Sequence, residues 1–522
     1  MKKTANILLL AGAALLLSAR VSAQGPEDLL RFSQYNWSYG TARSAAMGGA
    51  FSSLGADLSS MMLNPAGLGM YRRSEIGFSP SFTSLAIKNN NVNDLDGGWI
   101  NNSSNRNRFA LNNIGAAFNV YNSSGGVTSV TFGFAYNKLI DHNTNMEVRG
   151  LSGGSMADMF VEQLNFNRVD PGRVEGYLND GAYAGILGAL MSFESGLTEY
   201  DDALGVYHVA NTLGPDSRLN SYLHKQTTGS TGQYDISLGM NVSNILYLGL
   251  GFGLQDIYYK ETSDYSETAN NNLTGQGYLE GFSYNTFLKQ TGSSWNFKLG
   301  AIIRPVEELR IGLAFHTPTY INIDEQYYAD MYTKLYGYNE GHSGSKDFRS
   351  SYNLRTPMRF IGGISYTFFN TAILSIDYER VWYNQMKLFW NGWDSEDTDV
   401  TREVKDVYKP ANNLRAGLEV NVAPNWFTRV GVAYYDSMYK DGTLLSESAF
   451  DRYDGRTVNY SGGFGYRTGT WGIDLAYIYM DRKEQGRVFN YWNDETELWT
   501  SSAAYKNDRQ RHNVTATLSW RF

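Results

Sequence analysis

The last eleven residues of the chain, HNVTATLSWRF, alternate strictly between polar and apolar side chains. Val514, Leu518 and Trp520 fall on one face of an extended strand, whereas Asn513 and Thr517 fall on the other. Alternation with a period of two is typical of a β-strand that has one apolar and one polar face. The same pattern recurs in WGIDLAYIY, TAILSIDYE, MRFIGGISYTFF and YDISLGMNV. The pattern therefore predicts a chain built mainly from antiparallel strands.

Fourteen segments follow this pattern, and the connections between them are of two kinds. Six connections are short, each joining an even-numbered segment to the next, namely NSSGG, NVSN, PVEE, FNT, APN and RTGT. All the others are long. Bacterial outer-membrane barrels have an even number of strands, short periplasmic turns and long outer loops. We therefore predict an all-β membrane protein, a 14-stranded antiparallel outer-membrane β-barrel over residues 74–522, with both chain termini in the periplasm. The predicted strands lie near 74–88, 107–121, 127–141, 229–242, 245–262, 291–304, 309–322, 353–369, 371–388, 404–422, 426–440, 455–467, 470–485 and 508–522.

The first 23 residues have the features of a secretory signal peptide. Lys2 and Lys3 precede the apolar run ILLLAGAALLL, and the segment ends in Val21-Ser22-Ala23. We expect cleavage before Gln24 and export to the outer membrane of a Gram-negative bacterium. The later sequence contains no stretch of about 20 apolar residues, so no membrane-spanning helix is predicted.

The composition fits an exported barrel and excludes several classes of function. The chain has 38 Tyr, 26 Phe, 11 Trp and 54 Gly, which suits a barrel with aromatic girdles. Its net charge of −8 argues against nucleic-acid binding. It has no cysteine, six scattered histidines and no nucleophile or phosphate-loop motif. We therefore expect no metal, no cofactor and no enzymatic activity.

Residues 24–73 do not alternate and are rich in small side chains, as in SAAMGGAFSSLGADLSS and LNPAGLG. Small side chains allow a backbone to pack closely against a barrel wall. Pro65 fixes one backbone angle, and Gly67 and Gly69 permit tight turns. The lumen of a 14-stranded barrel is open to water unless something fills it. This segment is therefore predicted to plug the lumen, with an ordinary periplasmic lead-in as the alternative.

The stretch ARSAAMGGAFSSLGADLSSMMLNPAGLG resembles the N-terminal hatch of the FadL/TodX-type outer-membrane transporters. The motif that carries the resemblance is Asn64, Pro65 and Ala66, followed by Gly67, and it covers the hatch only. The resemblance implies a hatch-plugged 14-stranded barrel and diffusion-driven uptake of a long-chain fatty acid or a similar lipid-like compound. It also implies capture at an outer loop, transfer to a lumen pocket and release when the hatch shifts.

The longest predicted loop, at about 142–228, contains two stretches with helical periodicity. In SMADMFVEQLNF the apolar residues recur at i, i+3, i+4 and i+8. In the resembled family, helices of the loop after the third strand form an outward-facing apolar groove, and methionine adapts to varied apolar shapes. The alternative is that the two helices pack on each other as a lid. The candidate substrate-binding residues are Met156, Met159, Phe160, Leu164, Leu187 and Leu190.

Several ionisable residues have the inward phase of their predicted strands. Arg359, Arg415 and Arg429 are candidates for binding a carboxylate in the lumen. The alternative is that they form structural pairs with acidic residues, since polar lumen walls are the rule in such barrels. Pro80 and Pro318 each remove a ladder donor within a predicted strand. Either is a candidate for the sideways opening that the resemblance implies, and an ordinary bulge is the alternative.

Two other functions are compatible with the sequence. One is an interaction protein, a FadL-like barrel that acts as partner or cargo shuttle in a secretion or surface-assembly complex through its extracellular loops. The other is a general porin, against which the predicted plug argues. For the transporter hypothesis, the expected partners are a hydrophobic small-molecule ligand and outer-membrane lipid around a monomeric barrel.

Overall fold

The computed structural model describes residues 25–91, 99–100, 102–152, 154–210, 219–269, 279–440, 454–493, 498–502 and 505–522. The predicted signal peptide, residues 1–23, lies outside these ranges. Among the residues described, no helix combines the length and the apolar composition needed to cross a membrane.

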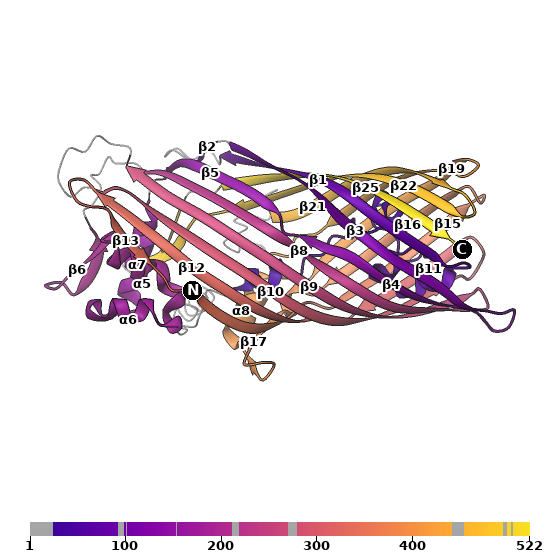
Figure 1. Ribbon diagram of the computed structural model, residues 1–522, viewed down its shortest axis with the longest axis horizontal. Coiled ribbons are helices and arrows are strands. Elements are labelled where there is room, and N and C mark those ends of the chain that lie inside the picture. Colours follow the sequence, from indigo (N-terminus) through magenta and orange to yellow (C-terminus); the bar gives the residue numbers. More distant parts are fainter. Residues whose placement is uncertain are drawn as a thin grey trace, which may run out of the picture.

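Fourteen antiparallel strands close into a barrel (Figure 1). The first strand pairs with the last, with Phe78 opposite Leu518. Three barrel strands are interrupted and carry two labels each. In chain order the strands are β1 (Glu75–Asn91), β3 (Asn102–Asn122), β4 (Val127–Asp141) with β5 (Thr144–Ser152), β8 (Leu219–Val242), β9 (Leu246–Ala269), β10 (Leu279–Ile303), β11 (Leu309–His316) with β12 (Tyr320–Leu335), β14 (Phe348–Arg355) with β15 (Arg359–Phe368), β16 (Ala372–Val381), β19 (Ala411–Ala423), β20 (Trp426–Tyr435), β21 (Asp454–Arg467), β22 (Trp471–Gly486) and β25 (Tyr505–Arg521).

The predicted strand number and the six short turns are confirmed. The strands nevertheless run further at the other end than the sequence pattern indicates, since β8, β9 and β10 have 24, 24 and 25 residues. Beyond a membrane both faces of a strand can be polar, so the alternation fades there. The predicted loop at 142–228 was for this reason too long. The structure assigns β5 and the first part of β8 to the barrel wall.

The outer face of the barrel carries an apolar band. Leu250 and Trp471 are 58% and 61% exposed on this face, whereas Arg415 is fully buried inside. Aromatic pairs lie towards the ends of the band, such as Trp295 stacked on Tyr320 with ring centroids 4.7 Å apart. An outward apolar band with aromatic girdles is typical of membrane-spanning barrels.

Residues 155–210 form a cap beyond the long ends of the strands (Figure 1). Ser155 caps the first helix of the cap by accepting from the amide of Ala157 at 3.0 Å. The Glu267 carboxylate of β9 accepts from the Met156 amide at 2.7 Å and from the Ser155 hydroxyl at 2.5 Å. These bonds attach the cap to the wall. Its elements are α5 (Met156–Phe166), η2 (Pro171–Arg173), α6 (Val174–Leu178), η3 (Gly181–Ile186), α7 (Leu187–Glu194), β6 (Thr198–Asp201) and β7 (Val206–Val209).

Residues 25–73, the hatch, lie within the ring of strands. Most of their side chains are buried against the wall or each other. The hatch contains α2 (Pro26–Arg31), α3 (Ala42–Ala46), α4 (Ser60–Leu63) and η1 (Pro65–Met70). Three short strands pair with the barrel strands β5, β12 and β14 at the long end of the wall: β2 (Trp99–Ile100), β13 (Gly341–Gly344) and β17 (Lys387–Trp390). The remaining elements are η4 (Tyr383–Gln385), β18 (Ser395–Glu396), α8 (Thr398–Val407), β23 (Asn490–Asn493) and β24 (Leu498–Ser501).

Candidate functional site: a lumen chamber above the hatch

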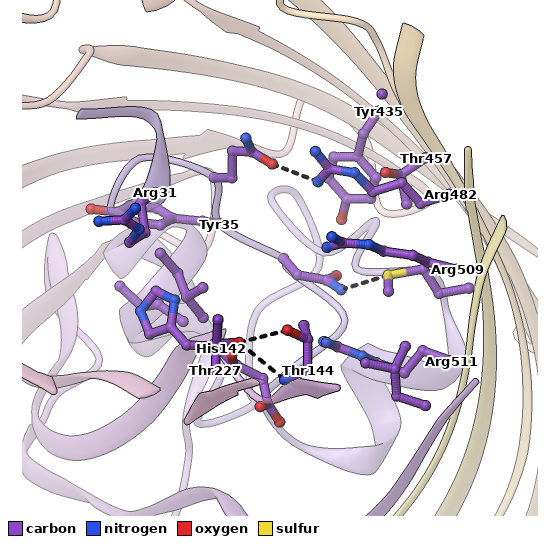
Figure 2. Close-up of a pocket in the computed structure, with 18 of the residues that line it drawn as sticks. Arg31, Tyr35, His142, Thr144, Thr227, Tyr435, Thr457, Arg482, Arg509 and Arg511 are labelled. Carbon is purple, nitrogen blue, oxygen red and sulfur yellow. Dashed lines mark hydrogen bonds between the residues drawn. The ribbon is translucent and has the colours of Figure 1, made fainter. Parts of the chain in front are cut away.

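A cavity of about 350 Å³ lies between the hatch and the barrel wall (Figure 2). Leu85 and Met146 line it and also belong to the apolar cluster that contains the cap helices. We call this cavity the chamber. Its volume falls in the range of small-molecule sites. The hatch contributes Arg31, Gln34, Tyr35, Asn36 and Tyr39 to its lining.

Three arginines project into the chamber from one wall, as Figure 2 shows. Arg482 of β22 is directly opposite Arg509 of β25, and Arg511 is two residues further along β25. We call these three the arginine ladder. Arg482 and Arg509 share one carboxylate, Glu484, at 2.9 and 2.5 Å. Two guanidinium groups that share one carboxylate keep a net positive charge.

The arginine ladder is bonded to the hatch through neutral acceptors. Arg482 donates to the side-chain oxygen of Gln34 at 2.6 Å. Arg511 donates to the Tyr39 hydroxyl. Within the described part of the chain, no carboxylate lies within ion-pair distance of Arg511. An anion that entered the chamber would therefore meet guanidinium groups that are not fully neutralised.

The chamber is amphipathic. Across the whole lining, cations outnumber carboxylates, with Arg31, Lys225, Arg482, Arg509 and Arg511 against Asp141, Glu261 and Asp436. The apolar part of the lining consists of Leu85, Leu139, Ile140, Met146, Met438 and Met480. This combination suits a ligand that has both an apolar body and an anionic group.

His142 lies between β4 and β5, beyond the apolar band, and faces the chamber opposite the arginine ladder (Figure 2). Burial, with Arg31 nearby, lowers the pKa of His142 to about 3. The imidazole is thus neutral at physiological pH, and its Nε2 lies 3.0 Å from the Thr231 hydroxyl. His142 therefore adds a polar but uncharged surface to the chamber.

The wall beside the chamber has an incomplete strand pairing. The β3–β4 ladder runs from Asn122 opposite Ser129 to Asn113 opposite Asn137 and ends there. Among the described residues, the part of β3 before Asn113 has no ladder partner in β4 or β5, and the pairing resumes only at β2, where Trp99 is opposite Gly150 of β5. Side chains bridge the gap instead, since Arg106 Nη1 donates to the carbonyls of Thr144 and Thr227 at 2.9 and 2.8 Å. We call this gap the seam.

The two prolines singled out in the sequence have different surroundings. Pro80 lies at a bulge in β1, where the register with β3 shifts between Ser79 and Pro80. Pro80 therefore lies at a β-bulge, which the sequence analysis gave as the alternative to a sideways opening. Pro318 lies in the break between β11 and β12. The bulge at Pro80 lies opposite Asn113 and Leu111 of β3, where the β3–β4 ladder ends and the seam begins, whereas Pro318 lies between strands that do not border the seam.

Glycines of the barrel wall make the seat for the hatch. At ten of them, an added Cβ would come closer than 3.0 Å to a hatch atom, a distance that real Cβ atoms essentially never show. We call this set the glycine belt, and each member lies on a different strand. Hatch and wall are therefore in direct backbone contact at this level. The members are Gly77, Gly133, Gly239, Gly249, Gly300, Gly312, Gly363, Gly417, Gly431 and Gly463.

Asn64 joins the end of the hatch to two wall strands. Its side-chain oxygen accepts from the Ala66 amide at 3.1 Å, which caps the η1 turn that starts at Pro65. Its amide nitrogen lies 2.7 Å from the Ser52 carbonyl, and 3.3 Å from each of the carbonyls of Ala301 and Leu313. One buried side chain thus fixes the hatch turn on β10 and β11.

Glu379 of β16 is the central carboxylate of an ion-pair network between wall and hatch. It accepts from the Trp37 indole at 2.9 Å, from Arg359 at 3.3 Å and from Arg415 at 3.1 Å. Arg359 also donates to the carbonyl of Ser33 in the hatch. These groups are buried. The network therefore ties the hatch to the wall by charge-assisted bonds.

A second network holds the region around α3. Arg43 of the hatch pairs with Glu419 of β19 at 2.8 Å. Glu419 also pairs with Arg429, which reaches Asp474 of β22 at 2.7 Å. The predicted lumen arginines Arg359, Arg415 and Arg429 thus lie in structural ion pairs. Among the described residues that line the chamber, none of these three appears.

We compared the sequence and the structure with known proteins. No family model matches the sequence, and no curated protein matches it either. A solved structure of a Pseudomonas aeruginosa FadL homologue is 14% identical, covers 93% of this chain and 98% of its own, and superposes with a TM-score of 0.50. The chain has the FadL-type barrel fold.

Two further solved structures are similar at lower scores. The CymD monoaromatic hydrocarbon channel is 13% identical over 94% of this chain and 99% of its own, with a TM-score of 0.49. The Pseudomonas putida toluene transporter TodX is 11% identical over 92% of this chain and 98% of its own, with a TM-score of 0.48.

In this FadL-type barrel the predicted loop helices are packed against each other and the wall. Phe160, Leu164, Leu187 and Leu190 are almost fully buried, Met156 is 7% exposed, and Met159 is partly buried. The residues belong to one apolar cluster with strand residues such as Tyr265 and Phe282. The observed arrangement is that of a lid, and a direct role in binding substrate stays a prediction.

The arginine ladder is the part of the site that the sequence analysis missed. The signal was present, because Arg509 and Arg511 continue the inward phase of Asn513 and Thr515 in the terminal strand. Arg482 likewise continues the inward phase of Asp474. The stagger between neighbouring strands decides which inward residues lie at the same height in the barrel. The sequence alone does not reveal that stagger.

Proposed function

We propose that this protein is an outer-membrane channel of a Gram-negative bacterium for hydrophobic compounds that carry an anionic group, such as a long-chain fatty acid. The observation that carries the proposal is the arginine ladder beside apolar side chains in a chamber closed below by the hatch. A neutral hydrocarbon has no group that could accept hydrogen bonds from the three inward arginines. Burying an arginine is costly unless it is paired. The names of the similar solved structures, a toluene transporter and a hydrocarbon channel, support transport of apolar compounds in barrels of this fold.

The chamber also couples the ligand to the hatch. Arg482 and Arg511 now donate to Gln34 and Tyr39 of the hatch. A carboxylate is a stronger acceptor for a guanidinium than a neutral amide or hydroxyl oxygen. A bound anion takes over these donors and weakens the upper attachment of the hatch.

Binding of oleate to the purified barrel tests the function. We expect the double substitution Arg482→Gln, Arg511→Gln to weaken oleate binding by about tenfold or more, since each lost bond involves two charged groups. Titration calorimetry in a neutral detergent measures this affinity, with methyl oleate as the uncharged probe.

The control variant is Arg349→Gln, which removes an arginine that is exposed and paired with Asp347 on the outside. It should bind oleate as the wild type does. Equal binding of oleate and methyl oleate by the wild type would contradict the proposal. So would unchanged oleate binding in the double variant.

The seam gives the chamber a sideways route out of the barrel, at the outer edge of the apolar band. Leu139, Ile140 and Asp141 line the chamber and belong to the end of β4 that borders the seam. Among the described residues, side chains bridge β3 and β5 at this height, below the point where β2 pairs with β5. The lower end of the lumen is filled by the hatch against the glycine belt. Exit through the seam therefore requires fewer contacts to break than exit past the hatch.

A disulfide across the seam tests this route, and the natural chain has no cysteine to interfere. The Ser104 hydroxyl donates to the Asn145 carbonyl across the seam. We expect Ser104→Cys with Asn145→Cys to lower oleate uptake by cells to near the level without the barrel when oxidised. Uptake should recover after reduction.

The control pair is Ser365→Cys with Ser375→Cys, which joins two strands that are already paired in register. Oxidation of this pair should leave uptake unchanged. Full uptake with the seam cross-linked would show that the compound leaves by another route.

A further inference from the structure

Two lysines face each other on the outer wall of the barrel. Lys260 of β9 and Lys289 of β10 are directly opposite in register. Like charges in this arrangement destabilise an antiparallel pair. A repulsive pair on a regular part of the wall indicates that something outside the chain compensates the charge.

Both lysines point outwards. Lys260 is the next outward residue after Tyr258, which is 41% exposed. Lys289 has the same strand phase as the outward residues Trp295 and Phe297, with no register shift in between. On β9 the outward residues before Tyr258 include Leu250 and Leu254, which belong to the apolar band, and the exposed Asp256, which lies two outward positions from Lys260. The ammonium groups thus lie just beyond the band, on the side away from the short turns.

The surroundings of the lysines do not neutralise them. Lys260 Nζ lies 5.2 Å from the ring centroid of Phe287, and Lys289 Nζ lies 6.0 Å from that of Tyr258. These cation–π contacts attract the charges but leave them in place. In the described part of the chain, no carboxylate is within ion-pair distance of either lysine. Asp324, on the neighbouring strand, accepts from the Ser351 hydroxyl at 2.6 Å.

The neighbouring side chains complete a surface for a lipid. Thr228 of β8 is directly opposite Lys260 and supplies a hydroxyl beside it. On the far side from the band, Phe287 is stacked on Tyr328 with centroids 4.6 Å apart. On the band side, the same two strands expose apolar side chains on which acyl chains can lie. These are Leu250, Leu254, Phe297 and Leu299.

We propose that Thr228, Lys260 and Lys289 bind the phosphate of an anionic lipid in the outer leaflet, with its acyl chains on the apolar surface of β9 and β10. The height of the lysines matches the headgroup level, and a phosphate neutralises both ammonium groups at once. The inference rests on the outer-membrane placement proposed above and is independent of the compound that the chamber binds.

Native mass spectrometry of the full barrel, purified in a neutral detergent, tests this site. The probes are dioleoyl phosphatidic acid and dioleoylglycerol, which share acyl chains and differ in the phosphate. We expect the wild type to retain phosphatidic acid, and Lys260→Gln with Lys289→Gln to lower its apparent affinity by about tenfold. The variant Lys260→Arg with Lys289→Arg should still retain phosphatidic acid. Dioleoylglycerol should bind the wild type and all the variants with the same apparent affinity.

The control variant is Lys88→Gln with Lys346→Gln, which removes two lysines of other strands and loops. It should bind phosphatidic acid as the wild type does. Equal retention by the wild type and the Lys260→Gln, Lys289→Gln variant would overturn the proposal. Displacement of the lipid by excess inorganic phosphate alone would also overturn it, because the site would then be one for a free anion.

Thermal unfolding gives a second, independent readout on single variants. Without lipid, Lys260→Gln removes the repulsion, so it should unfold at the same or a higher temperature than the wild type. With phosphatidic acid present, the wild type should gain more thermal stability than Lys260→Gln. An equal gain in both proteins would contradict the site. None of these outcomes depends on oleate binding in the chamber.

Discussion

Replacing Glu379 with alanine is expected to release the hatch and convert the closed barrel into a conducting pore. Glu379 is fully buried and accepts from Trp37 of the hatch and from Arg359 and Arg415 of the wall. Removing it leaves two guanidinium groups buried without this carboxylate. Breaking a buried ion pair by removing one partner typically costs about 3–5 kcal/mol. A lumen of 14 strands without its plug is wide enough for water and ions.

Single-channel recording in planar bilayers measures this effect, together with thermal unfolding of the same preparation. The control is Glu308→Ala in the exposed turn between β10 and β11. The wild type and the control should stay closed, whereas Glu379→Ala should show open-channel current and a lower unfolding temperature. A closed and equally stable Glu379→Ala barrel would mean that the network does not hold the hatch.

The substitution Gly249→Val is expected to unseat the turn at Asn64–Gly67. A Cβ at Gly249 would come closer than 3.0 Å to backbone atoms of Pro65 and Ala66. The strand cannot yield, because β9 is paired on both sides over its full length. The hatch must move instead, and overpacking of this kind costs about 1–3 kcal/mol or more.

Protease treatment of the folded barrel measures the hatch displacement directly. We expect cleavage within residues 25–73 to be much faster in Gly249→Val than in the wild type. The matched control is Gly362→Val, where an added Cβ has its nearest neighbours at 3.8 Å. Equal protection of the hatch in Gly249→Val and Gly362→Val would refute the close seat.

The barrel was predictable from the sequence because the membrane imposes a strong pattern on it. In the terminal strand and in WGIDLAYIY, every second residue faces lipid, and the structure exposes Trp471, Ile473, Leu475 and Leu518 as expected. The pattern weakens where the wall leaves the membrane. Thr262 to Ala269 of β9 alternate poorly because both faces can be polar, so this extension of the strand was not foreseen.

The hatch and its seat were predictable to different degrees. Small residues around Asn64 indicated a plug, since only short side chains permit close backbone contact. The glycines opposite them, such as Gly249 and Gly300, lie on strands far away in the sequence. Each looks like an ordinary strand glycine until the register brings it against the hatch.

The site was less predictable than the fold for a related reason. Arg359 and Arg415 have the inward phase, which the sequence showed, but their pairing with Glu379 depends on which strands are neighbours and at what stagger. The same uncertainty hid Arg482 and Arg511. Period-2 alternation decides the face of a residue but not its height in the barrel. The height of an inward arginine decides whether it pairs with a carboxylate beside the hatch or projects into the chamber.

Crystals of the barrel grown with a fatty acid that carries a terminal bromine test the central claim most directly. The anomalous signal of bromine locates the end of the chain, and the electron density locates the carboxylate. The account predicts the carboxylate within hydrogen-bonding distance of Arg482 or Arg511 and the bromine among the apolar side chains of the chamber. Bromine found only on the outer wall, with an empty chamber, would contradict it.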